Sequence, residues 1–498
     1  MITGELRIAL AGIVALVSLV AFEALAVSTA MPVVATELGG LRHYGLAFSL
    51  FLTTSLLGMV LAGGWTDARG PLAPTVAGMA AFCAGLVVSG TASTFAVMLA
   101  GRVVAGLGGG ILVVCLYVVV GAVFAEEARP TVFAWMSSGW VLPALVGPPL
   151  AGWLAGQVTW RLVFLLVPPL ALLALAVLGR RLAAIGAQPG GSAEGGPAQR
   201  RRRLLLGLAL AAGAALAQAG ASALVPLRAL PVLALVAGLA LVAASLPRLL
   251  PAGTLRAARG LPSVVAVRGL LTACFAGAEA YVPLMLVLER GLSVTVAGLA
   301  LTGGAVGWAA GSFAQSRPGM RVPRHRLLST GGVVISLVVA ALALPSLHLL
   351  PALAVPVLWA VAGAGMGLAL SSTGVLVLAM APAAERGRAS SALQLSDALG
   401  SVVGIAAAGA VLAARTGEQA AHGAGAAASA TGPDDGGLTF AVIFAGLAVA
   451  GVAAAVVGAR ARPASPTGAG PAAPTAPGPA TSPNGTPDAP ASTSVALP

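Results

Sequence analysis

Long apolar stretches alternate with short polar segments along this chain, from the first residues to about residue 460. Each stretch reaches the length of roughly 20 residues that an α-helix needs to cross a bilayer. Six stretches precede Arg180, two follow the next polar segment, and six more complete the series. We therefore predict fourteen spanning helices, at about 9–33, 44–65, 73–92, 95–124, 131–155, 160–179, 204–224, 229–247, 262–288, 294–315, 327–346, 351–380, 388–413 and 438–459.

Three polar segments interrupt or end this series. Residues 179–203 are rich in Gly, Pro and Arg and predict a flexible linker, and residues 418–437 predict a long hydrophilic loop. The tail consists mainly of Pro, Ala, Thr and Ser and predicts disorder. The predicted fold is an all-α integral membrane protein with an N-terminal six-helix bundle, a linker with two extra transmembrane helices, a C-terminal six-helix bundle and the tail, over residues 1–180, 181–250, 251–460 and 461–498.

Composition indicates that lipid, rather than water, surrounds most of this chain. Hydrophobic residues make up 58% of the 498 positions, charged residues only 8%, and the mean hydropathy is +0.98. Too little polar surface remains to cover a soluble core of this size. The net charge is +12, but the basic residues are all Arg and lie mostly in short segments between apolar stretches. That placement is typical of membrane proteins and argues against a nucleic-acid partner.

The Arg distribution also predicts how the chain crosses the membrane. With the N-terminus in the cytoplasm, 20 of the 27 Arg residues lie on the cytoplasmic side and 5 on the other, while Arg102 and Arg268 lie within spans. This asymmetry follows the positive-inside rule. Both termini are then cytoplasmic, as an even number of spans requires. We expect a monomeric, multi-pass protein of the plasma (inner) membrane.

Two sets of six spans suggest two halves related as repeats. Transporters built in this way bind their substrate near the bilayer midplane, between the halves. Gly and Pro are frequent within the spans, which favours close helix packing and helices that bend.

Acidic residues inside the predicted spans are the first candidates for function. Glu23 lies in the middle of the first span, Glu279 lies in the first span of the second half, and Asp397 lies nearer the cytoplasmic end of its span. A charged side chain at mid-bilayer costs about 2.5–3.5 kcal/mol on insertion scales, so such residues usually face a water-filled cavity on an ion or substrate path. We expect this of Glu23 and Glu279. For Asp397, a helix contact is an equal alternative.

Two Arg residues also fall within spans. Arg102 is flanked by apolar residues, so its guanidinium needs a carboxylate or backbone carbonyls as partners. Such a group near a proton-carrying acid could couple protonation to movement. Arg268 lies near the inner end of its span, and we expect it to extend to the membrane interface.

The remaining reactive residue types indicate neither a metal site nor an enzyme. Cys83, Cys115 and Cys274 lie far apart in apolar stretches, and the four His residues have no metal-ligand spacing. GLGGG at 106–110 lies within a span, so it is not a nucleotide-binding loop. We predict no cofactor and no metal.

One motif lies in the first span and another lies between the second and third spans. FEALAVSTAMP at 22–32 contains Glu23, followed by small and apolar residues and a Pro. GGWTDARG at 63–70 combines a tight turn with a carboxylate near helix ends, through Gly63, Asp67 and Gly70.

Two further motifs lie in the fourth and fifth spans. RVVAGLGGG at 102–110 begins with Arg102. PALVGPPLAG at 143–152 contains a Gly-Pro pair, in which Pro removes a helix hydrogen bond and favours a bend. Its characteristic positions are Gly147, Pro148 and Gly152.

Together, in this order and on these spans, the four motifs resemble those of the major facilitator superfamily, specifically its fourteen-span drug–proton antiporter branch. The resemblance extends to about residue 460. It implies that Glu23 takes the place of an acid that is more often Asp in the branch, and that Arg102 takes a basic position implicated in proton coupling. It also implies that 143–152 is the motif associated with export. Pro71 and Leu72 depart from the pattern, since basic residues are usual there.

The resulting hypothesis is a proton-coupled exporter of a hydrophobic, cationic or amphipathic drug or antibiotic, driven by the proton gradient through alternating access. Alternatives are an exporter of an endogenous lipid or secondary metabolite, an importer, and a membrane enzyme or sensor. The last is disfavoured because the loops hold no nucleophile–base set, metal cluster or phosphate-binding loop.

Overall fold

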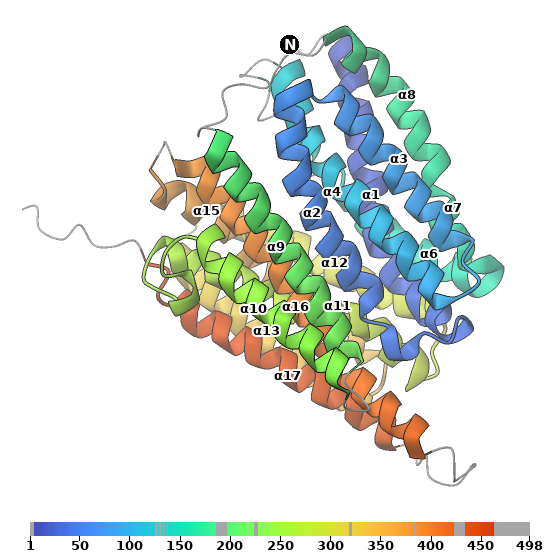
Figure 1. Ribbon diagram of the computed structural model, residues 1–498. Coiled ribbons are helices and arrows are strands. Elements are labelled where there is room, and N and C mark those ends of the chain that lie inside the picture. Colours follow the sequence, from blue (N-terminus) through green and yellow to red (C-terminus); the bar gives the residue numbers. More distant parts are fainter. Residues whose placement is uncertain are drawn as a thin grey trace, which may run out of the picture. The chain divides into compact units, whose positions relative to one another are not determined.

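The computed structural model describes residues 4–124, 128, 132, 135–136, 138–185, 197–223, 228–317, 321–382, 385–422 and 434–462. Every regular element within these residues is helical (Figure 1). The N-terminal helices are α1 (Gly4–Glu37), the short η1 (Leu41–His43), α2 (Leu46–Arg69), α3 (Leu72–Gly90), α4 (Phe95–Val123), α6 (Val141–Trp153), the π-helical η2 (Leu154–Thr159), α7 (Arg161–Leu165) and α8 (Val167–Ile185).

The rest of the described chain continues the same pattern of long apolar helices. Its elements are α9 (Pro197–Ser222), α10 (Ala229–Leu249), η3 (Thr254–Arg256), α11 (Leu261–Leu288), α12 (Val294–Ser316), α13 (Arg324–Ala341), α14 (Ala343–Ser346), α15 (Ala354–Met380), α16 (Arg386–His422) and α17 (Asp434–Gly458).

Thirteen helices among the described residues are long and apolar enough to cross a membrane. A shorter apolar helix, Arg161–Ala176, stands where we predicted the sixth span. Fourteen spans are therefore compatible with the structure. Part of the predicted fifth span, between 129 and 137, lies outside the described residues, as does the tail from residue 463.

Two predicted loops are shorter than expected. The linker predicted over 179–203 is helical up to Ile185 and again from Pro197, so 186–196 alone lies outside the described residues. The loop predicted over 418–437 is shortened at both ends, because α16 extends to His422 and α17 begins at Asp434. In both places helical hydrogen bonding continues past the last apolar residue, because Ala, Gln, Glu and Arg there are good helix formers.

Close backbone contacts hold α2 and α3 against α4. A Cβ atom added at Gly110 would collide with the carbonyl oxygen of Ser55 on α2, and one added at Gly108 would collide with the backbone nitrogen of Phe82 on α3. Small residues let transmembrane helices approach in this way. Gly108 and Gly110 therefore serve helix packing.

The two halves of the chain meet near the ends of α1, α11 and α16, at the end that the Arg distribution predicts to be extracellular; we call this the outer end. The hydroxyl of Tyr44 donates to the carbonyl oxygen of Ala280 at 2.9 Å, and the rings of Tyr44 and Tyr281 lie 5.3 Å apart between centroids. Tyr281 in turn donates to the carbonyl of Ile405 at 3.3 Å, and its hydroxyl lies against Gly45. These contacts close the outer end in this conformation.

The contacts of α4 predict that a methyl group added at Gly110 destabilises the protein, whereas one added at Gly109 does not. We expect Gly110→Ala to lower the free energy of unfolding by about 1–3 kcal/mol, because α2 and α4 must move apart. Thermal unfolding of the purified protein in detergent measures this loss. Gly109→Ala is the matched control, since its Cβ would meet the Phe51 ring at an ordinary 3.5 Å. An equal loss in both variants would contradict the explanation.

Candidate functional site

A buried ion pair joins the first and fourth spans of the N-terminal half. Glu23 on α1 is 0% exposed and Arg102 on α4 is 2% exposed. Nη1 of Arg102 pairs with Oε1 of Glu23, while its Nε donates to the carbonyl oxygen of Ala47 on α2 at 2.9 Å. The guanidinium carbon also lies 4.2 Å from the centre of the Phe51 ring. Arg102 therefore has both kinds of partner that its position in a span requires, a carboxylate and a backbone carbonyl.

The carboxylate of Glu23 is only half satisfied. Its second oxygen, Oε2, is buried and has no hydrogen-bond partner in the described part of the chain. Burying an ion pair without completing its hydrogen bonds is unfavourable relative to an apolar packing of the same volume. This pair is therefore poor evidence for stability.

One expectation about Glu23 is wrong for this conformation. We expected its carboxylate to face a water-filled cavity, and the structure instead encloses it among α1, α2 and α4. The reason is Arg102, which draws the carboxylate towards α4 and satisfies its charge there.

Glu279 lies in a different environment from Glu23. It is half-buried on α11 and makes no hydrogen bond or ion pair within the described residues. Its neighbour Ala280 accepts the hydrogen bond from Tyr44 that joins the two halves. The structure therefore does not bring Glu279 to the Glu23–Arg102 pair, but places it beside the contact that closes the outer end.

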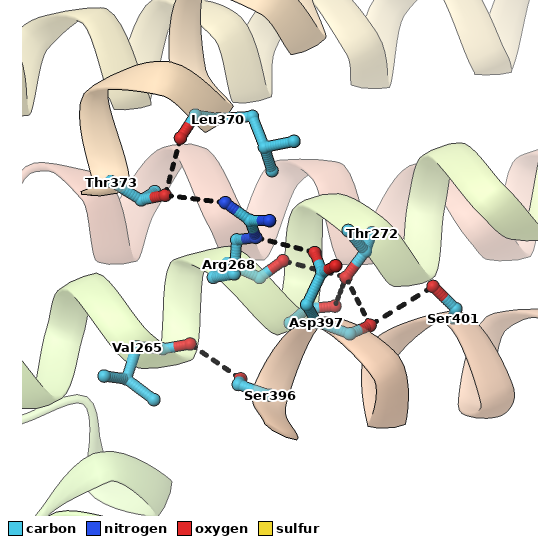
Figure 2. Close-up of polar contacts among 9 residues, drawn as sticks. Val265, Arg268, Thr272, Leu370, Thr373, Ser396, Asp397 and Ser401 are labelled. Atoms are coloured by element: carbon cyan, nitrogen blue, oxygen red, sulfur yellow. Dashed lines mark hydrogen bonds and ion pairs between the residues drawn. The ribbon is translucent and has the colours of Figure 1, made fainter. Parts of the chain in front are cut away.

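Asp397 and Arg268 form a second ion pair, in the C-terminal half (Figure 2). Nε of Arg268 donates to Oδ1 of Asp397 at 2.6 Å, and its Nη1 donates to the hydroxyl of Thr373 at 3.1 Å. The backbone carbonyl of Asp397 accepts hydrogen bonds from Thr272 and Ser401 at 3.1 and 3.2 Å. The network joins α11, α15 and α16.

The expectation that Arg268 extends to the membrane interface is therefore wrong. Its side chain is 13% exposed and is directed at a carboxylate on α16. A partner 129 positions away in the sequence decided this orientation. Asp397 is less enclosed than Glu23, since 30% of its side chain is exposed.

The turn after α2 explains one of the predicted motif residues. Gly70 has a φ of +73° and ends α2, with its N–H bonded to the carbonyl of Thr66 at 2.9 Å. Side chains rarely adopt this conformation, so Gly is required there. Gly63 has open space where a Cβ would lie, so packing gives no reason for it. The side chain of Asp67 lies outside the described residues.

The Gly-Pro motif of α6 lies where the halves meet. A Cβ added at Gly152 would lie 2.7 Å from the backbone of Thr295 at the start of α12, and Gly298 packs on the carbonyl of Pro148. Gly147 faces Phe22 of α1 at ordinary contact distance. The motif thus provides a flat face for α12, which allows the two backbones to approach closely.

Sequence reasoning missed a polar cluster at the outer end. Trp160 donates from Nε1 to Oε2 of Glu37 at 2.8 Å, and Arg161 pairs with Oε1 of Glu37 at 2.9 Å. Arg161 also donates to the carbonyl of Ala92 at 3.2 Å and lies over the Trp160 ring. The sequence did contain a signal for this cluster. Glu37 follows the first predicted span and Arg161 lies at the start of the sixth, so both are expected at the extracellular side.

Apolar helices in this number, with ion pairs buried among them, define an all-helical, multi-pass membrane protein. The sequence model of the Major Facilitator Superfamily matches residues 12–355, and the chain belongs to this family. A POT family transporter, PepTSo, superposes with a TM-score of 0.65 at 15% identity, covering 91% of this chain and 97% of that one. A bacterial homologue of the lysosomal transporter Spinster, inward-facing and unoccupied, has a TM-score of 0.59 at 17% identity, covering 91% and 95%.

Curated relatives share shorter stretches of sequence. The multidrug transporter protein MdtP of Bacillus subtilis is 28% identical over 32% of this chain and 30% of its own length. The Acurin A biosynthesis cluster MFS-type transporter of Aspergillus aculeatus is 29% identical over 29% and 26%. The multidrug efflux pump SdrM of Staphylococcus aureus is 23% identical over 31% and 35%. The chain thus matches about a third or less of the length of these relatives.

The buried pair makes a prediction about stability. Arg102→Leu leaves the Glu23 carboxylate buried without a partner, and we expect the free energy of unfolding to fall by about 3–5 kcal/mol. Adding Glu23→Leu removes the unpaired charge and should recover much of that loss. Thermal unfolding of both variants in detergent tests this, with Arg256→Leu as control because Arg256 is exposed. If the double variant is no more stable than Arg102→Leu, the pair is not the cause.

Proposed function

We propose that this protein is a proton-coupled exporter of hydrophobic, cationic or amphipathic compounds, acting by alternating access in the plasma membrane. The observation that carries the proposal is the buried Glu23–Arg102 pair with its unpartnered carboxylate oxygen. A proton on Glu23 removes the negative charge that holds Arg102, so protonation and the ion pair exclude each other. Because the pair joins α1 to α4, gaining or losing a proton changes how these helices pack.

Because Glu23 cannot be protonated and paired with Arg102 at the same time, the pair supplies the coupling that an antiporter needs. Any state in which Glu23 meets water from one side can take a proton from that side, and re-forming the pair expels it. Reciprocally, a substrate that favours the unprotonated, paired state drives proton release. The present conformation, with the pair formed and the outer end closed by Tyr44 and Tyr281, corresponds to the proton-free state in this scheme.

Glu279 and Asp397 take secondary roles in the proposal. Glu279 has no ion pair to break among the residues that the structure describes. It lies beside the contact between Tyr44 and Ala280, so its protonation would act on the outer end. Asp397 is tied to Arg268 and holds α11 to α16, which suits a helix brace in the C-terminal half. Both remain candidates for contact with a cationic substrate.

Export is favoured over import by two observations. Pro148 and Gly152 pack against α12 at the outer end, in the motif that the antiporter resemblance associates with export. Relatives from bacteria are named a multidrug transporter and a multidrug efflux pump. The POT and Spinster structures support the fold alone, because their identity to this chain is below 20%.

A second candidate is the export of an endogenous lipid or secondary metabolite on the same fold. The relative named for an Acurin A biosynthesis cluster favours this reading at similar identity. Susceptibility of a strain lacking the gene, tested over a broad compound panel, separates the two. Unchanged tolerance to every compound would favour the endogenous product.

The coupling is tested in membrane vesicles with ethidium as the probe and a pH-sensitive dye inside. We expect Glu23→Gln to reduce ethidium-driven proton release by at least about tenfold, within the range of known coupling factors. Glu289→Gln is the matched control, since Glu289 follows the end of α11 at the outer end. Unchanged proton release in Glu23→Gln would refute the role of Glu23.

A further inference from the structure

The first of the two extra helices, α9, takes part in the contact between the halves. It packs on α10, on α2 of the N-terminal half and on α16 of the C-terminal half. Gln218 of α9 is 4% exposed, and its Nε2 donates to the hydroxyl of Thr53 on α2 at 2.9 Å. A buried glutamine on a transmembrane helix is costly unless its polar atoms are satisfied, so this position has a specific partner.

A small cavity lies next to this hydrogen bond. Its volume is approximately 20 Å³, and its lining comes from all three parts of the chain. Ser49 and the outer-end residue His43 belong to the N-terminal half, Gln218 belongs to α9, and Ala406 and Gly409 belong to α16.

Within the described part of the chain, the lining includes two buried oxygen atoms that have no hydrogen-bond partner. They are the side-chain carbonyl oxygen Oε1 of Gln218 and the hydroxyl Oγ of Ser49. Buried hydroxyl and amide groups nearly always have a hydrogen-bond partner, which is commonly an ordered water. A cavity of this size exceeds the roughly 10–15 Å³ that one water requires. One water can donate to Gln218 and accept from Ser49 at the same time.

We propose that this cavity binds a single water molecule shared by Ser49 and Gln218, and that the site ties α9 to α2 and α16 while the outer end is closed. The cavity exists only where α2 and α16 lie together. This step rests on the proposed function: when the outer end opens, α2 and α16 separate and the water site is lost. The extra helix α9 is then part of the outer gate, and its polar side chain favours the closed state.

A labelling experiment on the full chain in lipid nanodiscs tests the proposal. A cysteine introduced as Ala406→Cys reports on the opening of the cavity to a membrane-impermeant maleimide, with the unsubstituted chain as background because Cys83, Cys115 and Cys274 are buried. We expect Ser49→Ala to speed labelling about three- to tenfold, the range for losing one hydrogen bond. Gln218→Leu should speed labelling at least as much, because it also removes the hydrogen bond to Thr53. Because both share one water, the double variant should be no faster than the faster single one.

Other outcomes overturn the proposal. If the two substitutions multiply each other's effect on the labelling rate, Ser49 and Gln218 share no ligand. If neither substitution changes the labelling rate, the site does not tie α9 to α2 and α16. Matched controls are Ser316→Ala on α12 and Gln394→Leu on α16, since both residues are exposed and neither lines the cavity.

A cryo-electron-microscopy map of the same sample identifies the ligand. Density for a water within hydrogen-bond distance of Ser49 Oγ and Gln218 Oε1 is the expected result, and a direct bond between the two side chains overturns it. This map also serves if Gln218→Leu fails to fold. Neither readout uses a substrate or a proton gradient, so failure of the water site and failure of proton coupling are separate results.

Discussion

The ion pair between Glu23 and Arg102 sets a constraint that the whole N-terminal half must meet. Two charges buried among apolar helices are tolerated only in contact, so α1 and α4 must cross where these residues lie. Arg102 then needs further partners, which α2 provides through the carbonyl of Ala47 and the ring of Phe51. This requires α2 to approach α4 closely, and Gly110 allows it. The small residues of α4 and the charge beside them belong to one arrangement.

The three intramembrane acids have three different environments. Glu23 is enclosed and paired, Asp397 is paired but partly exposed, and Glu279 is half-buried without a partner in the described chain. A proton on Glu23 removes an ion pair between two helices of one half. A proton on Glu279 removes none, but changes the charge next to the hydrogen bond that joins the halves. In the proposed mechanism, Glu23 therefore serves coupling, whereas Glu279 acts on closure.

Closure of the outer end combines several modest interactions. Tyr44 and Tyr281 link the halves through hydrogen bonds and ring contact, while Gly45 lets the backbone approach Tyr281. On the other side of the interface, α6 packs flat on α12. Helix α9 joins this region through Gln218. Because each interaction is weak in isolation, a small change in charge or hydration shifts the balance in the proposed alternating-access mechanism.

The sequence by itself determined the fold class, the positions of the spans and the residues whose charge is out of place in lipid. Hydropathy is a local property, which is why the span predicted at 262–288 appears as Leu261–Leu288. Family motifs added the transporter class. The tertiary structure alone decided which charges meet, because Glu23 and Arg102 lie 79 positions apart and Arg268 and Asp397 lie 129 apart. It also decided that Arg268 points towards α16 and that Gln218 lies where α9 meets α2 and α16, since both depend on which helices become neighbours.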